Sequence, residues 1–309
     1  MWRYRLQGRC AYRSGSNEDG TPNHGSPRRE SGKRARRNRR SGRKRAITGE
    51  SGRRGELNMA TTEATLYEIK KGAAWITLNR PENRNALSAA LVTELYDHIL
   101  ESNENDDVRS IVITGTGPAF CAGADLKSPP GQIADGAKRA VPYADVLTAI
   151  MDSPKPVIAA INGAAFAGGL GLVGAADIVV TDEDVQFSFS EVRIGVIPAI
   201  ISVVCLPKLG THHGMKLIVT GERFNGKRAV EMNFAHRAVP GAQLVEAVQE
   251  EIDMINLGGP IAVVECKKLV RRVPQLSIEE GFKETAEWSG RMFRSDEASE
   301  GMAAFREKR

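Results

Sequence analysis

The chain has 309 residues and a formal net charge of +5, and this positive charge comes from one end of the sequence. Residues 1–58 carry 17 Lys and Arg against 5 Asp and Glu, whereas residues 59–309 carry 26 basic and 33 acidic side chains. The mildly acidic remainder excludes a basic nucleic-acid-binding surface on the folded part of the chain.

Residues 1–58 are rich in Arg, Ser and Gly and have almost no aliphatic run, so we expect a disordered leader. This leader lacks the apolar stretch of a secretory signal. Two interpretations remain open. The basic block RRESGKRARRNRRSGRKR suits a nucleic-acid-binding arm. Alternatively, the start codon is placed too early and Met59 opens the natural protein.

The four cysteines, Cys10, Cys121, Cys205 and Cys266, are scattered without a C-x-x-C pair or a histidine cluster, which argues against zinc. Reduced cysteines in a chain without a signal predict a cytoplasmic protein. No segment approaches the roughly 18 consecutive apolar residues of a membrane-spanning helix, so we expect no membrane partner.

The first predicted elements after the leader are two strands, 65–70 and 74–79, joined by the Lys71–Gly72 turn. A polar loop, residues 80–85, follows them. Ser88 is then expected to cap a helix that carries Leu91, Leu95 and Ile99 on one face. A buried strand at 110–114 leads into the small-residue turn of PAFCAGADLK, residues 118–127. The Pro- and Gly-rich loop 128–141 is suited to line or cover a pocket.

A second small-residue turn follows a helix at 142–151 and an apolar, β-branched strand at 157–161. Adjacent Gly168 and Gly169 allow a ligand to approach the backbone, and the helix predicted to run to about Ala175 directs its free N–H groups there. Two turns of this kind, each after a buried strand and each able to donate an N–H, are what an oxyanion hole requires.

The next predicted strand, 185–189, leads into Ser190 and Glu191 in the sequence FSFSE. At a half-buried strand end the Glu191 carboxyl pKa would rise toward the range useful for proton transfer. An exposed glutamate that caps a helix is the equally weighted alternative.

Beyond Gly195 the pattern predicts helices with short connectors, at 200–209, 213–220, 226–232, 243–255, 260–273, 278–293 and 296–307. The preceding alternation of strands and helices predicts an α/β fold with a parallel sheet covered on both faces. Residues 169–174, GLGLVG, match a dinucleotide-binding G-x-G-x-x-G, but they lie too far from the strand and no strand then presents an acid at the usual offset.

Five motifs, in order and in spacing, resemble the enoyl-CoA hydratase/isomerase (crotonase) superfamily: LNRPENRNALS, PAFCAGADL, NGAAFAGGLGL, FSFSEVRIGVIP and EGMAAFREKR. The resemblance runs from about Thr65 to the C-terminus, and this favours Met59 as the true start. It implies a spiral of ββα repeats over residues 59–258 and a C-terminal helical region, residues 259–309, that makes trimer contacts.

The resemblance also implies roles for individual residues. Ala124 and Gly168 match the two backbone N–H donors that hold the thioester oxygen, and Glu191 matches a catalytic glutamate. The positions that match coenzyme A contacts are Arg84, Ala86, Ala122, Asp125, Leu126 and Lys127, with Phe305 and Lys308 expected to reach the CoA of a neighbouring subunit. Coenzyme A is then part of the substrate, and no separate cofactor is expected.

Gly171 stands where typical hydratases of this family carry a second catalytic glutamate. We expect its missing side chain to leave room for a branched, bulky or aromatic acyl group. With Glu191 alone, the first expectation is an enoyl-CoA hydratase, and the second is a Δ3-Δ2-enoyl-CoA isomerase, which needs one carboxylate. A hydratase-lyase and an inert acyl-CoA-binding module remain further alternatives. The expected partners are an acyl-CoA thioester and further copies of this chain in a trimer or hexamer.

Overall fold

The computed structural model describes residues 63–127 and 140–308, all of which belong to one compact unit, residues 59–309. The predicted leader, residues 1–58, and nearly all of the predicted loop 128–141 lie outside the described residues.

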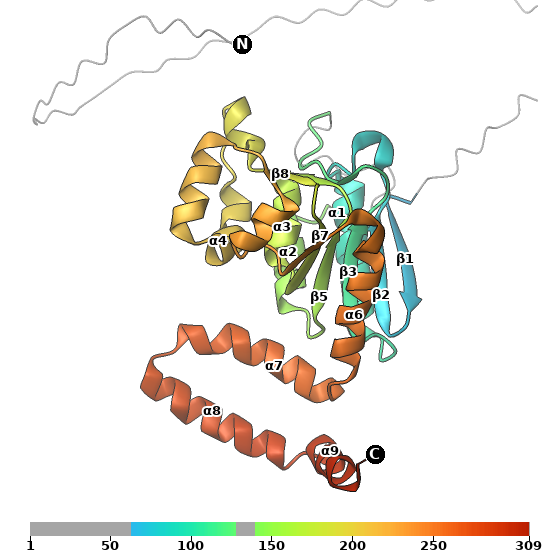
Figure 1. Cartoon of the computed structure of the whole chain (residues 1–309), viewed down its shortest axis with the longest axis vertical. Coiled ribbons are helices and arrows are strands. Elements are labelled where there is room, and N and C mark those ends of the chain that lie inside the picture. The colour runs from blue at the N-terminus through green and yellow to red at the C-terminus, as the bar shows by residue number, and fades with distance from the viewer. Residues whose placement is uncertain (1–62, 128–139, 309) are drawn as a thin grey trace, which may run out of the picture. The chain divides into compact units, whose positions relative to one another are not determined.

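A six-stranded sheet forms the centre of the unit (Figure 1). In spatial order its strands are β1 (Thr65–Lys70), β2 (Ala73–Leu78), β3 (Ser110–Gly115), β5 (Val157–Ile161), β7 (Ile178–Asp182) and β10 (Arg237–Val239). Strand β1 pairs with β2 in antiparallel fashion, and the remaining neighbours are parallel. The predicted strands at 65–70, 74–79, 110–114 and 157–161 are therefore present, within one residue at each end.

Both faces of this sheet are buried, because alternate residues of each strand point to opposite sides. Trp75, Val112 and Ile158 face helix α6 (Leu244–Asn256). Ile76 and Ile113 belong instead to a larger core that includes the buried faces of α1 (Ala89–Glu104), α2 (Tyr143–Asp152) and α3 (Gly168–Ala175). The prediction of a sheet covered on both faces is confirmed.

A second, four-stranded sheet holds the short strands β4 (Ala119–Cys121), β6 (Ala164–Phe166), β8 (Gln186–Ser188) and β9 (Phe224–Asn225). Strands β4, β6 and β8 run parallel to one another, and β9 is antiparallel to β8. The chain alternates between the two sheets, so β3–β4–α2 and β5–β6–α3 are successive ββα repeats, and β7–β8 opens the next. This arrangement confirms the predicted spiral of ββα repeats.

Helix α4 (Ala199–Thr220) combines the two helices predicted at 200–209 and 213–220, and it is interrupted at Gly210, whose backbone is not helical (φ 65°, ψ 168°). A short helix, α5 (Gly226–Glu231), follows β9 and is capped by Asn225. The Ser88 cap is also confirmed, since its hydroxyl accepts a hydrogen bond from the Leu91 amide over 3.3 Å.

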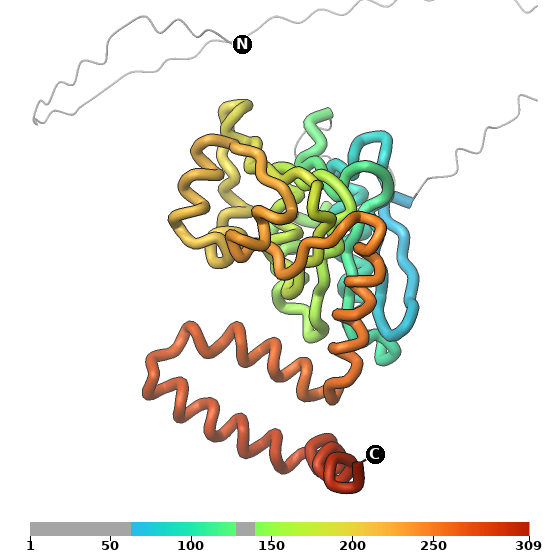
Figure 2. The backbone as a smooth tube through the Cα atoms, viewed as in Figure 1, coloured from blue at the N-terminus to red at the C-terminus, as the bar shows by residue number. Residues whose placement is uncertain are grey.

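Three helices, α7 (Pro260–Arg272), α8 (Ile278–Phe293) and α9 (Asp296–Glu307), end the chain. Figure 2 traces the chain from α6 into α7 and back along α8. Arg272 binds Glu284 through two hydrogen bonds of 2.9 and 3.0 Å, and the Trp288 indole N–H donates to Glu265 over 2.8 Å, so α7 and α8 form a pair.

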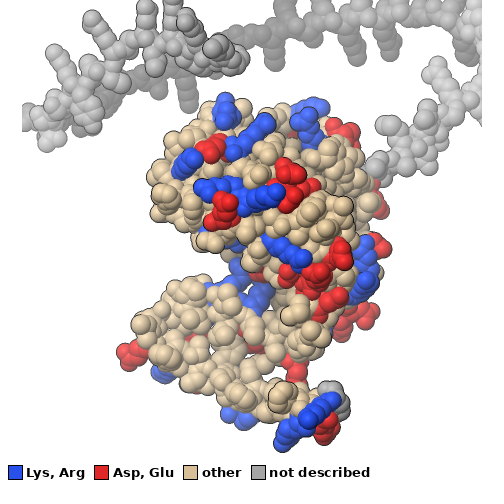
Figure 3. Space-filling view, in the orientation of Figure 1, with Lys and Arg blue, Asp and Glu red and all other residues tan. Residues whose placement is uncertain are grey.

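None of these three helices contains a buried residue. Apolar side chains remain exposed along them, such as Ile278 at 82%, Phe282 at 75% and Phe293 at 68%. Figure 3 shows few charged side chains over α7 and α8 on the face in view.

Candidate active site

The predicted catalytic positions follow three parallel strands of the small sheet and lie at one edge of that sheet. Cys121 of β4 lies opposite Ala165 of β6, and Phe166 of β6 lies opposite Ser188 of β8. The chain beyond each strand therefore emerges on the same side: Ala124 after β4, Gly168 after β6 and Glu191 after β8. Ligands of α/β proteins bind at such carboxyl ends of parallel strands.

The turns that carry Ala124 and Gly168 are in contact. A Cβ placed on Gly168 would lie 3.7 Å from the Ala124 nitrogen, and one on Gly123 would lie 3.1 Å from the Gly168 nitrogen. Within residues 63–127 and 140–308, neither the Ala124 nor the Gly168 amide donates a hydrogen bond. Two adjacent amides without an acceptor form a site for a developing oxyanion.

Ala167, the residue before Gly168, has a strained backbone with φ 48° and ψ −124°. A residue with a Cβ rarely adopts positive φ, and such strain persists where the surrounding structure imposes it. The Ala167 amide donates to the Ser188 carbonyl over 3.0 Å, and a Cβ on Gly123 would come within 2.8 Å of the Ala167 methyl. This kink directs the first amide of α3 away from the strand direction and toward Ala124.

Glu191 lies in the 3-10 helix η2 (Ser190–Ile194) rather than at a strand end, and it is half-buried. Its Oε2 atom is buried and has no hydrogen-bond partner among the described residues. Burial raises the pKa of this carboxyl above its ordinary value of 4.5, although a hydrogen bond to its own backbone acts in the opposite direction. Of the two interpretations of Glu191, the structure favours the half-buried carboxyl over the exposed cap.

The loop formed by residues 80–87 runs along the turn that follows β4. The Ala122 amide donates to the Arg84 carbonyl over 3.0 Å, and the Leu87 amide donates to the Gly123 carbonyl over 2.8 Å. The predicted coenzyme A positions in these two segments, Arg84 and Ala86 on one side and residues 122–127 on the other, therefore lie together.

Asp125 uses its carboxylate within the protein, since Arg80 Nη1 lies 3.0 Å from Asp125 Oδ2. Burial alone would raise the pKa of Asp125, but the hydrogen bonds from Arg80 and from the Lys127 amide, with the positive charges of both residues, lower it. The carboxylate is thus an anchor for the loop. Arg80 also donates to the Ala86 carbonyl over 2.8 Å, which ties the loop of residues 80–87 to the same arginine.

The other predicted coenzyme A contacts differ in how accessible they are. Leu126 is 79% exposed, and the exposed Lys127 ammonium donates to Asn83 over 3.3 Å. Arg84 is exposed and has positive φ, 53°, as the residue that ends a 3-10 turn, η1 (Pro81–Asn83), whereas Ala86 is buried. Leu126, Lys127 and Arg84 are therefore accessible from solvent, whereas Ala86 is not.

Gly171 lies buried inside α3, and the space beside it is filled. A Cβ on Gly171 would lie 2.7 Å from Ile201 Cγ2 and 2.7 Å from the Tyr143 hydroxyl. The expectation that the missing side chain leaves room for a bulky acyl group is wrong here, because the Tyr143 phenol and Ile201 take the volume that a glutamate would have entered.

Phe305 and Lys308 lie on and at the end of α9. Phe305 is 86% exposed, and Lys308 closes the helix with φ 59°. Among the described residues, no hydrogen bond or ion pair joins Phe305 or Lys308 to the segment around Glu191.

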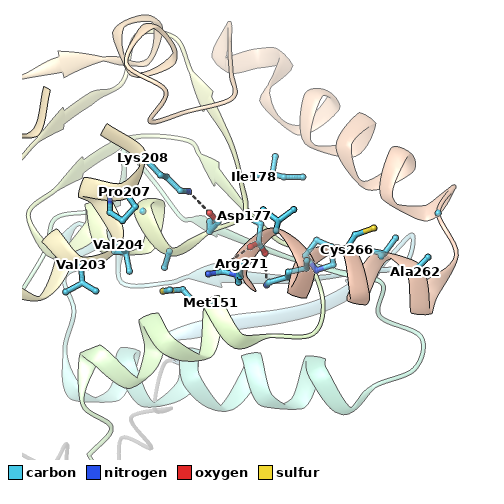
Figure 4. A pocket seen from close by; sticks show the side chains of 18 residues that line it. Met151, Asp177, Ile178, Val203, Val204, Pro207, Lys208, Ala262, Cys266 and Arg271 are labelled. Atoms are coloured by element: carbon cyan, nitrogen blue, oxygen red, sulfur yellow. Dashed lines mark hydrogen bonds and ion pairs between the residues drawn. The ribbon is translucent and has the colours of Figure 1, made fainter. Parts of the chain in front are cut away.

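A cavity of about 650 Å³ lies elsewhere, between α4, the end of α3 and α7 (Figure 4). Asp177 lies in it between Lys267, 2.6 Å away, and Arg271, 2.8 Å away. Lys208 donates to carbonyls at the end of α3, and desolvation lowers its pKa to about 8. The ion pairs of Asp177 with Lys267 and Arg271 join α7 to the α/β body. None of the predicted catalytic positions lines this cavity.

Two residues with structural roles in the site were not predicted from the sequence. Asn85 is fully buried with φ 54°, and its side chain bonds Arg80, Thr116 and Ala119. Tyr143 donates its hydroxyl proton to the Gly168 carbonyl over 2.5 Å. Asn tolerates the left-handed conformation, which is the one signal that could have identified Asn85. For Tyr143, which acts on a residue 25 positions away, no local pattern exists.

Within the described part of the chain, no helix is long and apolar enough to cross a membrane. The same residues contain no group of three or more His, Cys, Asp or Glu side chains arranged to hold a metal ion. Cys121 is fully buried, and burial raises the pKa of its thiol to about 12.

The family model and the similar proteins that match this chain all point to the same family. Residues 68–309 match the family model described as enoyl-CoA hydratase/isomerase. The chain is 36% identical over 256 residues to carnitinyl-CoA dehydratase of Proteus mirabilis, covering 81% of this chain and 95% of the relative. It is 32% identical over 259 residues to enoyl-CoA hydratase EchA19 of Mycobacterium tuberculosis, covering 81% and 97%.

Among solved structures, an enoyl-CoA hydratase from Bacillus anthracis superposes with a TM-score of 0.74 at 31% identity, covering 80% of this chain and 97% of that one. These relatives span nearly their whole length on residues that include both turns and Glu191.

Proposed function

The chain belongs to the enoyl-CoA hydratase/isomerase family, and from this premise we propose that it catalyses the reversible addition of water to a trans-2-enoyl-CoA, giving a 3-hydroxyacyl-CoA. One observation carries the proposal: a half-buried Glu191 carboxyl with an unpartnered oxygen follows the same sheet edge as two adjacent amides without acceptors. The names of the relatives, a dehydratase and a hydratase, both describe water chemistry.

In the proposed mechanism the thioester oxygen accepts hydrogen bonds from the Ala124 and Gly168 amides. Ionised Glu191 holds a water molecule and takes one of its protons as the oxygen adds to C3. The negative charge then resides on the enolate oxygen, where each preorganised donor contributes roughly 3 kcal/mol. Protonated Glu191 returns its proton to C2, so that H and OH have been added across the double bond. The reaction needs no cofactor besides the coenzyme A of its substrate.

A raised pKa suits Glu191 to both halves of this cycle, because a group that accepts and returns a proton works best when its pKa approaches the working pH. We therefore expect kcat/KM to rise with pH along an acid limb that lies above the ordinary glutamate value of 4.5.

A Δ3-Δ2-enoyl-CoA isomerase is the second candidate, favoured by the filled space beside Gly171. Because Tyr143 and Ile201 occupy the place of a second carboxylate, one carboxylate has to do the acid–base work. Moving a single proton between C2 and C4 requires no more than that.

The deciding experiment offers the full chain trans-2-enoyl-CoA and trans-3-enoyl-CoA of short and long chain length and follows the absorbance of the conjugated enoyl thioester. Loss of absorbance from the 2-enoyl substrate, reduced at least ~100-fold in Glu191→Gln, supports the hydratase. Appearance of absorbance from the 3-enoyl substrate, with little loss from the 2-enoyl one, replaces it with the isomerase.

Glu231→Gln is the matched control, since Glu231 is an exposed glutamate paired with Arg228 on α5, and its activity should equal that of the parent chain. Acyl-CoA binding that Glu191→Gln leaves unchanged, with no turnover of either substrate, would identify an inert binding module instead.

We also propose that the chain assembles with copies of itself as a trimer or a hexamer through α7–α9, with Phe305 and Lys308 reaching the coenzyme A of a neighbouring subunit. The exposed apolar side chains of these helices support this assembly, and sedimentation of the purified chain measures it. We propose a cytoplasmic location.

A further inference from the structure

We propose that Tyr143 is a positioning residue for catalysis: its hydroxyl holds the first turn of α3 so that the Gly168 amide faces the thioester oxygen. This inference rests on the proposed function. Tyr143 begins α2, and its phenol reaches across to α3, where it donates to the Gly168 carbonyl over 2.5 Å.

The contact falls on the part of the backbone that carries strain. Ala167, with φ 48°, has no favourable reason of its own to adopt this conformation, so neighbouring contacts must hold it. On its N-terminal side, the Ala167 amide is fixed to the Ser188 carbonyl over 3.0 Å. On its C-terminal side, Tyr143 fixes the Gly168 carbonyl. The peptide whose N–H is the predicted oxyanion donor lies between these two attachments.

The Tyr143 hydroxyl stays a hydrogen-bond donor at every working pH. Burial raises its pKa well above the ordinary 10.0, and the nearby Cys121, Cys205 and Glu191 act in the same direction, while a hydrogen bond from the Leu172 backbone opposes them. A neutral phenol keeps its proton and so stays a donor to the Gly168 carbonyl.

The same phenol explains why the position of the second glutamate is empty. The hydroxyl lies 2.7 Å from where a Cβ on Gly171 would be, so a side chain at 171 would require the Tyr143 hydroxyl to shift from its present position. Tyr143 thus holds the turn that carries the proposed oxyanion donor, in the place where other family members are expected to have a second carboxylate.

Tyr143→Phe tests this directly, because it removes the hydroxyl and keeps the ring that fills the space. We expect kcat to fall about 10- to 100-fold and KM to change less than about threefold. The bound thioester carbonyl should also be less polarised, so butanoyl-CoA labelled with ¹³C at that carbonyl should lose at least half of the infrared shift that it shows on binding the parent chain.

Tyr67→Phe is the matched control. It removes a partly buried hydroxyl that Ser102 contacts over 3.3 Å, on β1 and outside the proposed site, and it should leave kcat, KM and the infrared shift unchanged. Amide hydrogen exchange over residues 164–172 provides a readout without any substrate, and we expect it to be about tenfold faster in Tyr143→Phe and unchanged in Tyr67→Phe.

Unchanged exchange, or a kcat within twofold of the parent chain, would overturn the role of Tyr143. Faster exchange in Tyr143→Phe, with a parent chain that neither binds nor converts enoyl-CoA, would support the contact of Tyr143 with this turn and reject the proposed function. The two proposals are therefore separable by one set of samples.

Discussion

Glu191 places a carboxylate where its charge is poorly stabilised. One oxygen is buried without a partner among the described residues, and burial raises the carboxyl pKa above 4.5. As pH rises from this value through the folded-state pKa, the folded chain binds more protons than the unfolded chain. The free energy of unfolding therefore falls over that window, and the loss is complete above it. If Glu191 is the catalytic base that we propose, its reactivity is obtained at the expense of stability.

Glu191→Gln should accordingly stabilise the protein while it abolishes activity. We expect the melting temperature at about pH 7.5 to rise by about 1–3 °C, because the buried charge is gone. The difference should vanish near pH 4, where glutamate is protonated in both states. Calorimetry at the two pH values checks this, with Glu231→Gln as the exposed control. A variant less stable than its parent at pH 7.5 would show that the carboxylate has a stabilising partner.

Sequence reasoning reached Ala124, Gly168 and Glu191 because each lies in a motif of contiguous residues. It did not reach Tyr143, whose partner is 25 residues away, and it mistook the space beside Gly171 for an open pocket. The absence of a side chain is visible in a sequence, but the neighbour that fills the resulting space is not. Packing from a distant helix decides such positions.

Among the elements, length explains part of what was predicted and part of what was missed, although β7 is as long as β5 and was not predicted. Helices α8 and α9 and strands β1 and β5 were predicted with the boundaries observed, because each repeats its pattern over enough residues. Strand β8 has three residues and was predicted, as 185–189. Strands β4 and β6 have the same length, too few residues for a period of two to appear, and they were not predicted. They are strands because they pair with one another, and this pairing links segments far apart in the sequence.

The loop of residues 80–87 owes its shape to Asn85. Asn85→Ala would remove its hydrogen bonds to Arg80, Thr116 and Ala119 and leave buried polar groups without partners. It would also place alanine at a positive φ of 54°. We expect a loss of about 3 kcal/mol in the free energy of unfolding, measured in urea.

Asn83→Ala, two positions earlier on the same loop, is the comparison for this loss. Its hydrogen bonds are exposed, so it should cost less than about 0.5 kcal/mol. Equal effects of the two variants would mean that Asn85 does not determine the shape of the loop.

One lysine, Lys267, is among the residues that join the C-terminal helices to the rest of the unit, together with Arg271. Lys267 of α7 has a side chain that is 8% exposed, and it contacts Asp177 over 2.6 Å and the carbonyls of Ile150 and Lys155 over 3.2 and 3.0 Å. Desolvation lowers its pKa, and the Asp177 carboxylate opposes that shift. Removal of this ammonium would take a donor from the Ile150 carbonyl, leave the Lys155 carbonyl with the Ser153 hydroxyl, and leave Asp177 with Arg271 as its remaining partner on α7.

Lys267→Met should therefore loosen α7–α9 without unfolding the α/β body. We expect amide exchange in these helices to be about tenfold faster and exchange in β3, β5 and β7 to stay unchanged. Lys268→Met is the matched control, because the neighbouring lysine has a side chain that is 56% exposed and pairs within α7 with Glu265. If exchange accelerates equally in both variants, the attachment does not depend on the buried ion pair.

The alternation of the chain between two sheets has a consequence for how the molecule folds. Each pass from β3 to β4, from β5 to β6 and from β7 to β8 adds one strand to the large sheet and one to the small sheet, so the two grow together. Any continuous segment long enough to contain all strands of one sheet also contains strands of the other sheet. The oxyanion donors and Glu191 can meet only after three passes are complete, which is late in folding for a topology of such distant pairings. Loss of the catalytic geometry and loss of the core should then be a single cooperative event, and no partly folded form of this chain would keep a working site.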